Sequence, residues 1–172
     1  RWLSDWSSDV CSSDLSMANL AASGGYWVAT PANAIFAEPG TITGSIGVFA
    51  VIPSFERSLA DYGVTSDGVR TTPLSGQPDL IGGLTPGVSG MLQATVENHY
   101  GHFLGLVGKA RGKSVDQVDA IAQGRVWDGG TARQLGLVDR FGNLDDAMAE
   151  AARLAKLEKD GWHAVHIGGE AD

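Results

Sequence analysis

Ser23 is the residue in this chain best suited to act as a nucleophile, because only small residues flank it. It lies in the segment NLAASGGYWVATP, residues 19–31, between two alanines and the pair Gly24 and Gly25. Small residues let a backbone bend sharply and let another group come close to it. Pro31 cannot continue a helix, so the helix predicted after the serine is short. Such a serine is either the N-cap of a short helix or a nucleophile, and the spacing alone favours the cap.

A serine nucleophile needs a base, and the sequence places no convincing one beside Ser23. A hydroxyl attacks once a neighbouring group takes its proton, and backbone amides must then stabilise the oxyanion. The amide of Gly24, at the start of the predicted helix, is a candidate oxyanion donor. The histidines and lysines fall on helix surfaces, at polar helix ends and in the tail, where solvated side chains are expected. They are His99, His102, His163 and His166, and Lys109, Lys113, Lys156 and Lys159.

Composition limits the classes of protein to consider. The chain has 172 residues, of which 43% are hydrophobic and 19% charged, as in one ordinary globular domain. A net charge of −8 argues against a nucleic-acid partner, which would require a basic face. The single cysteine, Cys11, excludes an internal disulfide framework, and we expect no metal and no cofactor. No apolar run approaches the roughly 20 residues of a membrane span, so we expect the chain itself to be soluble.

The first fifteen residues differ from the rest. RWLSDWSSDVCSSDL contains five serines and two of the five tryptophans, with neither helical nor strand periodicity. Residues 5–15 also match the in-frame translation of a common short-read sequencing adapter. We therefore predict that residues 1–15 are a non-native, adapter-derived leader, the alternative being a disordered terminus. The protein's own sequence would then begin near Ser16.

From Ser16 onward, predicted strands and helices alternate, which indicates an α/β fold. Strands are predicted at 33–38, 45–52, 64–70, 124–127 and 137–139, with a further one at 162–167. Helices are predicted at 26–30, 55–62, 88–110, 114–121 and 128–135, followed by an alanine-rich helix after Asn143. The run 45–52 (SIGVFAVI) is typical of a strand covered on both faces. Residues 71–87, with three prolines and four glycines, predict a long surface loop or lid.

Two sequence signatures resemble those of the S49 peptidase family, in particular its signal peptide peptidase (SppA) or protease IV group. The first comprises residues 17–31 (MANLAASGGYWVATP) and 40–48 (GTITGSIGV). The second comprises residues 123–139 (QGRVWDGGTARQLGLVD) and 142–147 (GNLDDA). The resemblance covers about Met17 to Leu157 and is strongest to the C-terminal half of the long, two-repeat form. It implies a ClpP/crotonase-like α/β fold, with a parallel sheet flanked by helices.

The resemblance also implies roles for individual residues. Ser23 would be the nucleophile, and the amide of Gly24 would help to bind the oxyanion. Ser45, otherwise readable as a turn serine ahead of a buried strand, matches a serine that positions a catalytic lysine. Short family members carry that lysine in a segment matching residues 72–75 (TPLS), where Ser75 takes its place. In the long form the lysine belongs to an N-terminal repeat, so the lysine of the Ser-Lys dyad is expected to lie outside this chain.

These expectations define one function and its alternatives. Residues 16–159 would be the C-terminal catalytic repeat of a serine endopeptidase that degrades cleaved signal peptides, and residues 160–172 a tail. Its partners would be peptide substrates, the missing N-terminal repeat and further copies in a tetramer-like ring. It would act at the periplasmic side of a bacterial inner membrane, through an anchor outside this chain. Tyr26, Trp27 and Phe49 would line the substrate groove or belong to the core.

Three other functions remain open at this stage. The chain could be a non-catalytic, structural or assembly half of a larger enzyme. It could be a phage-type S49 protease that processes capsid proteins. It could also be a crotonase-type acyl-CoA enzyme on the same fold, which would not need the serine hydroxyl. Full activity of a Ser23→Ala variant would favour this last class.

Overall fold

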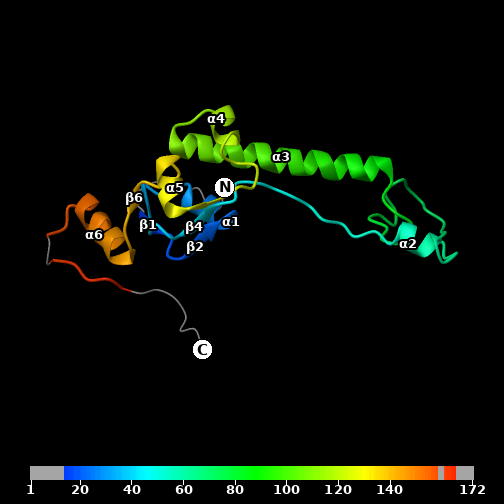
Figure 1. Cartoon of the computed structure of the whole chain (residues 1–172), viewed down its shortest axis with the longest axis horizontal. Coiled ribbons are helices and arrows are strands. Elements are labelled where there is room, and N and C mark those ends of the chain that lie inside the picture. The colour runs from blue at the N-terminus through cyan, green and yellow to red at the C-terminus, as the bar shows by residue number, and fades with distance from the viewer. Residues whose placement is uncertain (1–13, 159–160, 166–172) are drawn as a thin grey trace. The chain divides into compact units, whose positions relative to one another are not determined.

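The computed structural model describes residues 14–158 and 161–165 (Figure 1), and the chain divides into two compact units. Unit 1 combines the described residues up to Gly47 with those from Phe103 onward. Unit 2 consists of Val48–His102.

Unit 1 contains two three-stranded sheets. The first has the order β1-β3-β6 and is parallel throughout. The second has the order β2-β4-β5, in which β2 and β4 are parallel and β4 and β5 antiparallel. The strands are β1 (Asp14–Ser16), β2 (Leu20–Ala22), β3 (Ala34–Ala37), β4 (Ile42–Gly44), β5 (Val126–Asp128) and β6 (Arg140–Phe141). The predicted α/β fold with parallel strands flanked by helices is confirmed, with one antiparallel pair in addition.

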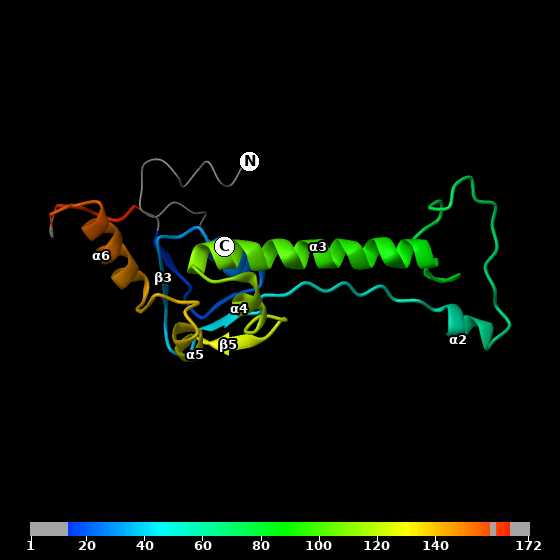
Figure 2. The same cartoon turned by 90° about the horizontal axis from the view of Figure 1, so that it is seen from above.

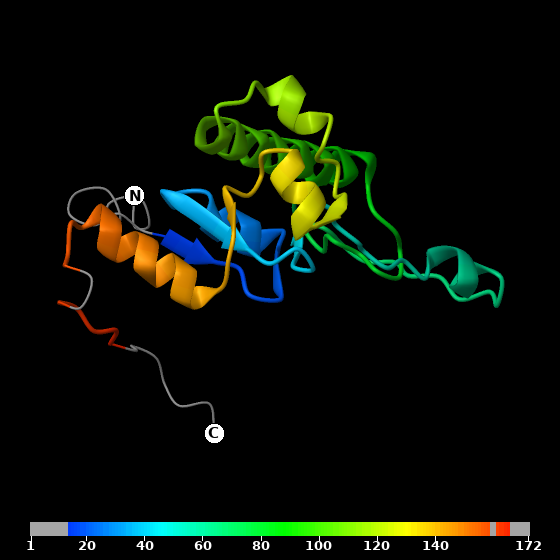
Figure 3. The ribbon, with the colours of Figure 1, turned by 60° about the vertical axis from the view of Figure 1, so that its left-hand side comes forward.

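The core of the first sheet is β3, whose four residues are all buried. A strand covered on both faces needs apolar side chains at every position, and AIFA provides them. Ala34 and Phe36 pack with Ala147 of α6 (Leu144–Leu154). The views show α6 lying beside β1 (Figure 3). The helix begins at Asn143, whose side chain accepts from the amide of Asp146 in a capping box, as the sequence predicted.

Two of the remaining helices of unit 1 begin at polar side-chain caps. The remaining helices are, within the described residues, α1 (Gly24–Ala29), α4 (Val115–Asp119), α5 (Gly129–Gln134) and the end of α3 (Pro86–Arg111). Ser114 caps α4 through a capping box with Gln117. Asp128 caps α5 by accepting from Thr131, and α5 packs against β5 (Figure 2). Gly136, at φ +74°, follows the end of α5 as expected for a helix-terminating glycine.

Unit 2 contributes no strand to either sheet. It contains α2 (Glu56–Ala60), the first part of α3 and irregular loops. Gly63, at φ +72°, follows α2 at the predicted end of that helix. The helix predicted at 88–110 is confirmed as α3, and residues 71–85 contain turns but no strand, as predicted. In α3, Val88 is buried near the start of the helix and Phe103, Leu104 and Val107 near its end, whereas Met91 is 57% exposed.

Two predicted strands have no counterpart in the structure, and the strand predicted at 137–139 is wrong in position, because β6 forms at Arg140–Phe141 instead. Residues 45–52 form no strand, and Phe49 is 87% exposed. The strand ends earlier, at Gly44, because Gly44 and Ser45 have φ angles of 76° and 49° and turn the chain away from the sheet. Residues 64–70 likewise have no strand partner and are exposed throughout. An apolar or alternating pattern forms a strand only where a neighbouring strand is available to pair with it.

The predictions for the two ends fall partly outside the described residues. The leader predicted at 1–15 overlaps β1, because Asp14 and Leu15 pair with β3. Residues 1–13 lie outside the described part of the chain, as does the end of the tail. Of the strand predicted at 162–167, the described residues 162–165 are irregular.

A polar network joins α1, the end of α3, β3 and the segment that leads into β6. The buried Tyr26 hydroxyl donates to the carbonyl of Leu137 at 2.8 Å. Both terminal nitrogens of Arg111 donate to the carboxylate of Asp139, at 3.0 and 2.5 Å. The amide of Ile35 donates to the same carboxylate at 2.8 Å. Burial of Asp139 opposes its charge, but the hydrogen bonds from Arg111 and Ile35 outweigh burial and lower its pKa.

We expect Asp139→Asn to destabilise unit 1 by about 2 kcal/mol at pH 7, because a charge-assisted, two-pronged hydrogen bond is lost. The folded-state pKa of Asp139 lies below the unfolded value, so the carboxylate stabilises the fold above the unfolded pKa. That contribution disappears as the pH falls through the folded pKa. Urea denaturation of both proteins at pH 7 and near pH 3 should show the difference shrinking in acid. A pH-independent difference would contradict this account.

Asp14 has an unfavourable position in β1. Neither oxygen of its carboxylate has a hydrogen-bond partner within the described residues, and both are buried. Burial and the neighbouring carboxylate of Glu150 raise the pKa of Asp14. Glu150 is itself compensated, because Arg153 and Arg140 approach it at 2.7 and 3.0 Å. The hydrogen bond from Arg153 helps to lower the pKa of Glu150 to about 2, so Glu150 remains charged.

Replacing Asp14 with valine should therefore raise the stability of the chain at pH 7. Removal of a buried polar group without a partner is worth about 1 kcal/mol or more, which corresponds to roughly 2–4 °C in Tm for this size. Since the pKa of Asp14 is raised in the folded state, its ionisation costs stability above that pKa and nothing below the unfolded value. Calorimetry should show the gain at pH 7 and a smaller one near pH 3. A lower Tm for Asp14→Val than for the parent at pH 7 would show that the Asp14 carboxylate does not destabilise the fold.

Candidate active site

Ser23 lies at a sharp turn between β2 and α1. Its φ and ψ are 53° and −116°, a conformation that residues with a Cβ adopt rarely and at a cost of about 1–3 kcal/mol. Its amide donates to the carbonyl of Gly44 at 2.8 Å, and its carbonyl accepts from the amide of Trp27 at 2.9 Å. Its side chain is exposed and makes no capping hydrogen bond. The prediction that the hydroxyl caps the helix is wrong, and the hydroxyl is left available.

Ser45 follows the neighbouring strand in the equivalent position. The register pairs Ala22 with Gly44, so Ser23 and Ser45 are the next residues after two adjacent parallel strands. Neighbouring strands lie about 4.8 Å apart. Ser45 is half-buried, also has a positive φ, of 49°, and its amide donates to the carbonyl of Arg125 at 2.7 Å. The structure therefore brings together the two serines that the sequence singled out.

The second sequence signature braces the turn at Gly44. Gly44 has a φ of 76°, and a Cβ there would approach the Trp127 ring to 2.7 Å. The indole N–H of Trp127 donates to the carbonyl of Ile121 at 3.0 Å, which fixes the ring. Two residues after Gly44, the carbonyl of Ile46 accepts a hydrogen bond from the amide of Gly124 at 2.9 Å. Residues of GRVWDGG thus support the backbone that carries Ser45.

Open space adjoins Ser23 on the side of α1. Gly24 is the first residue of the helix, so its amide has no acceptor within the helix. Among the described residues, none beyond its immediate chain neighbours and its own helix lies within 4 Å of the place where a side chain at Gly24 would begin. A substrate carbonyl could therefore approach both the hydroxyl of Ser23 and the amide of Gly24.

The aromatic residues near the turn serve mainly in packing. Tyr26 is fully buried, with its hydroxyl bound to a backbone carbonyl, so it belongs to the core. Trp27 packs against Phe103, with ring centroids 4.8 Å apart. Phe49 belongs to unit 2 and is largely exposed. Of the three residues considered for a substrate groove, Tyr26 is therefore excluded.

No base is found at the turn within the described residues. Lys109 and Lys156 are exposed and Lys113 is half-buried, and none of the three hydrogen-bonds to either serine. Ser75, which the resemblance predicted to stand in the place of the lysine of short family members, lies in unit 2, where its hydroxyl shares hydrogen bonds with Thr71 and Thr72. In the described ranges, no group of three or more His, Cys, Asp or Glu side chains could hold a metal ion.

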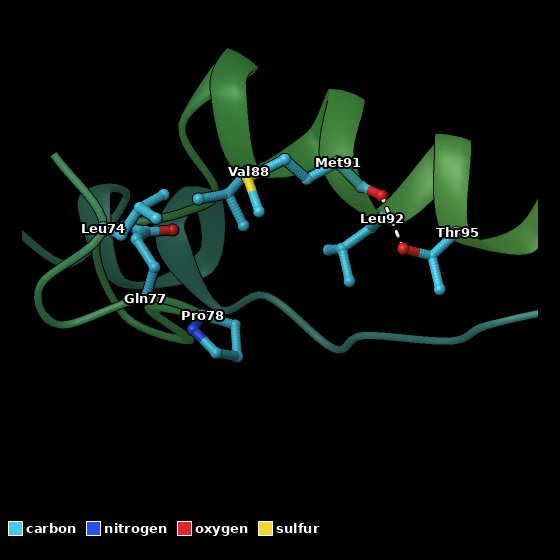
Figure 4. A pocket seen from close by; sticks show the side chains of 7 residues that line it. All are labelled: Leu74, Gln77, Pro78, Val88, Met91, Leu92 and Thr95. Carbon is cyan, nitrogen blue, oxygen red and sulfur yellow. Dashed lines mark hydrogen bonds between the residues drawn. The ribbon is translucent and has the colours of Figure 1, made fainter.

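Unit 2 contains an apolar hollow of about 260 Å³ between the loop and the first turns of α3 (Figure 4). Leu74, Pro78, Met91 and Leu92 contribute to its lining. The side-chain amide nitrogen of Gln77, which also lines it, is buried without a hydrogen-bond partner in the described structure. All of these residues belong to unit 2, whereas Ser23 and Ser45 belong to unit 1.

The sequence did not predict two buried polar features of unit 1. The buried hydroxyls of Thr41 and Thr43 each donate to a carbonyl of the segment that contains β2. The signal was the alternation in TIT, which places two hydroxyls on one face of a strand. The network around Asp139 was the second, and its signal was a lone carboxylate at the end of the apolar segment LGLVD.

Comparison with known proteins defines the family. The family model for peptidase family S49 matches residues 14–158, and the chain belongs to this family. Protease 4 of Salmonella typhi is 51% identical over 149 residues, which cover 87% of this chain and 24% of that protein. Protease 4 of Haemophilus influenzae is 43% identical, over 85% of this chain and 24% of that protein. The chloroplastic serine protease SPPA of Arabidopsis thaliana is 34% identical, over 83% and 21%.

The chain thus spans about a quarter of the length of these relatives. The class of enzyme that they define is a serine protease. Solved structures match less closely. The 1510-N membrane-bound stomatin-specific protease has a TM-score of 0.39 at 13% identity, covering 84% of this chain and 53% of that one. An enoyl-CoA hydratase/carnithine racemase from Magnetospirillum magneticum has a TM-score of 0.38 at 16% identity, covering 83% and 36%. No helix within the described residues is both long and apolar enough to cross a membrane.

Backbone strain at Ser23 has a measurable consequence. Glycine adopts a positive φ without a steric penalty, whereas alanine retains the Cβ that causes the strain. Ser23→Gly should therefore be more stable than Ser23→Ala, by about 1 kcal/mol. Ala149, at an exposed position inside α6, provides the control. There the parent alanine should be more stable than Ala149→Gly, the reverse order, since glycine weakens a helix. Equal unfolding free energies for the two Ser23 variants would show that the turn is not strained.

Proposed function

We propose that this chain is the nucleophile-bearing module of a serine endopeptidase, with Ser23 as the nucleophile. The observation that carries the proposal is the strained, exposed conformation of Ser23, whose hydroxyl makes no capping bond at the start of α1. Strain of this kind persists where the surrounding structure holds it, and it is concentrated at catalytic turns. A serine that merely capped the helix would be expected to use its hydroxyl for the cap.

The proposed chemistry uses three groups of this chain. The Oγ atom of Ser23 attacks the carbonyl carbon of a peptide bond while a neutral lysine takes the hydroxyl proton. The oxyanion that forms accepts a hydrogen bond from the amide of Gly24. The amine leaving group takes the proton as the bond to it breaks, and water then hydrolyses the acyl-enzyme. The hydroxyl of Ser45, one strand away, orients the lysine.

The lysine of this Ser-Lys dyad is proposed to come from outside the chain. The resemblance implies that Ser75 stands where short family members carry this lysine, and the two Protease 4 relatives are each more than three times as long as this chain. A polypeptide partner that carries the lysine, corresponding to an N-terminal repeat, would complete the site. The isolated chain would accordingly be inactive.

Substrates and surroundings follow from the same proposal. We take the substrates to be cleaved signal peptides, degraded at the periplasmic face of a bacterial inner membrane to which another part of the protein is anchored. Several copies would assemble into a tetramer-like ring. The apolar hollow of unit 2 and exposed side chains such as Phe49 and Val51 support partners of this kind, because large exposed apolar patches generally mark contact surfaces.

We place the peptidase module at residues 16–159, followed by a tail at 160–172, and we propose that residues 1–15 are foreign to it. The unpartnered carboxylate of Asp14 supports this boundary, because a residue selected for β1 would be expected to suit its buried surroundings. Sequencing of the source gene by an independent library method tests it. Recovery of the same codons before Ser16 would disprove the foreign origin.

Labelling with a fluorophosphonate tests the function. Alone, the chain should not label. Mixed with a lysine-bearing N-terminal half, it should label at Ser23 and hydrolyse peptides, because the hydroxyl then has a base. Ser23→Ala should abolish both, by a factor of at least about 10³ in kcat, and leave the fold intact by circular dichroism. Ser89→Ala, at an exposed position in α3, is the matched control and should behave as the parent.

Three outcomes would contradict the proposal. Labelling of the chain without a partner would show that the base lies within it. Retained kcat in Ser23→Ala would end the assignment of the nucleophile and favour a crotonase-type acyl-CoA reaction. A chain that folds, binds its partner half and never labels would have a structural role only.

A further inference from the structure

Two threonines tie β4 to the segment before Ser23. Thr41 and Thr43 are 1% and 0% exposed. The hydroxyl of Thr43 donates to the carbonyl of Ala21 at 2.7 Å, and that of Thr41 donates to the carbonyl of Ala18 at 2.5 Å. Buried hydroxyls cost free energy unless they are hydrogen-bonded, and both of these are. The two side chains thus add two links to the strand pairing itself.

The two links act at different places. The Thr41 hydroxyl also accepts from the amide of Glu38 at 3.0 Å, so it fastens the beginning of β4 to the loop before β2. The Thr43 hydroxyl binds the carbonyl of Ala21, two residues before Ser23. It therefore orients the last part of the backbone before the strained turn.

A strained turn keeps its shape only when its surroundings determine it. The Ser23 turn is held on one side by the hydrogen bond that the amide of Ser23 donates to the carbonyl of Gly44, at 2.8 Å. The turn also requires the correct register between β2 and β4, because a slip by one residue would move each side chain to the opposite face of the sheet. Thr43 is the residue before Gly44, and its hydroxyl binds the carbonyl of Ala21 on the neighbouring strand. It therefore supports both the hydrogen bond between Ser23 and Gly44 and the register of β2 with β4.

We infer that Thr43 is a positioning residue for Ser23, holding the strand end so that the serine turn keeps its strained conformation. This inference rests on the proposed function of Ser23 as nucleophile. Thr43 is buried on the covered face of the sheet and acts only through the backbone of Ala21, so it does not touch a substrate. Thr41, equally buried and equally bonded, stabilises the fold without controlling the turn.

Hydrogen exchange by NMR tests the positioning without requiring activity. The Ser23 amide reports on the turn. The Ile35 amide, which lies in β3 of the other sheet and donates to the carboxylate of Asp139, reports on unit 1 as a whole. Thr43→Val removes the hydroxyl and keeps the shape. It should speed exchange at Ser23 about tenfold relative to Ile35, because local opening becomes easier. Thr43→Ser should restore the parent ratio.

The matched control is Thr41→Val, which also loses a buried hydroxyl from the same face of β4. It should alter exchange at Ser23 and Ile35 in parallel, leaving their ratio within about twofold. If Thr43→Val does not fold, the comparison of Thr43→Ala with Thr43→Ser replaces it, with the same expected ratio. A parallel change of the two amides in the Thr43 variants would overturn the inference.

Kinetics supply the second readout, with the lysine-bearing half added. Thr43→Val should lower kcat about 10- to 100-fold and leave KM within twofold, because misplacement of the nucleophile affects the reaction more than binding. Thr43→Ser should restore kcat, and Thr41→Val should keep it. An unchanged kcat in Thr43→Val would count against the inference. Failure of the parent to label at Ser23, with the exchange result unaffected, would instead count only against the proposed function.

Discussion

The parallel pairing of β2 with β4 is the interaction on which the candidate site depends. It makes Ser23 and Ser45 the first residues after two adjacent strands, so that both side chains are presented at the same edge of one sheet. Both residues have left-handed φ angles, which the hydrogen bonds from Ser23 to Gly44 and from Ser45 to Arg125 help to hold. The antiparallel strand β5 closes the arrangement from the other side of β4.

The strain at this edge is supported by well-satisfied structure elsewhere in unit 1. The buried strand β3 forms the centre of one sheet, and the pair of Arg111 with Asp139 connects it to the end of α3. Tyr26 fastens α1 to the same region through its hydroxyl. The helix that follows the strained serine is therefore anchored by side chains whose polar groups are all bonded, which is how a local cost of a few kcal/mol can persist.

Local signals in the sequence predicted much of this fold. The caps at Ser114 and Asn143 were identifiable because a side-chain oxygen followed three residues later by a polar partner has one common use. The failure at 45–52 has a different origin. Apolar β-branched residues are compatible with a strand, but pairing requires a neighbour, and no pattern within the segment reports one. The conformation of Ser23 was also beyond local patterns, since a cap and a nucleophile share the same flanking residues and differ in φ and ψ. The spacing favoured the cap, and only the family signatures favoured the nucleophile.

Within the described residues, all six strands belong to unit 1, and Val48–His102 supplies none of them. The chain leaves unit 1 just after the Ser45 turn and returns within α3, so unit 2 is an insertion between two parts of unit 1. Insertions of this kind can change in length and sequence while the framework stays constant. The two units are thus free to diverge at different rates, and a graft exchanged at Gly47 and Phe103 would replace one of them without rewriting the other.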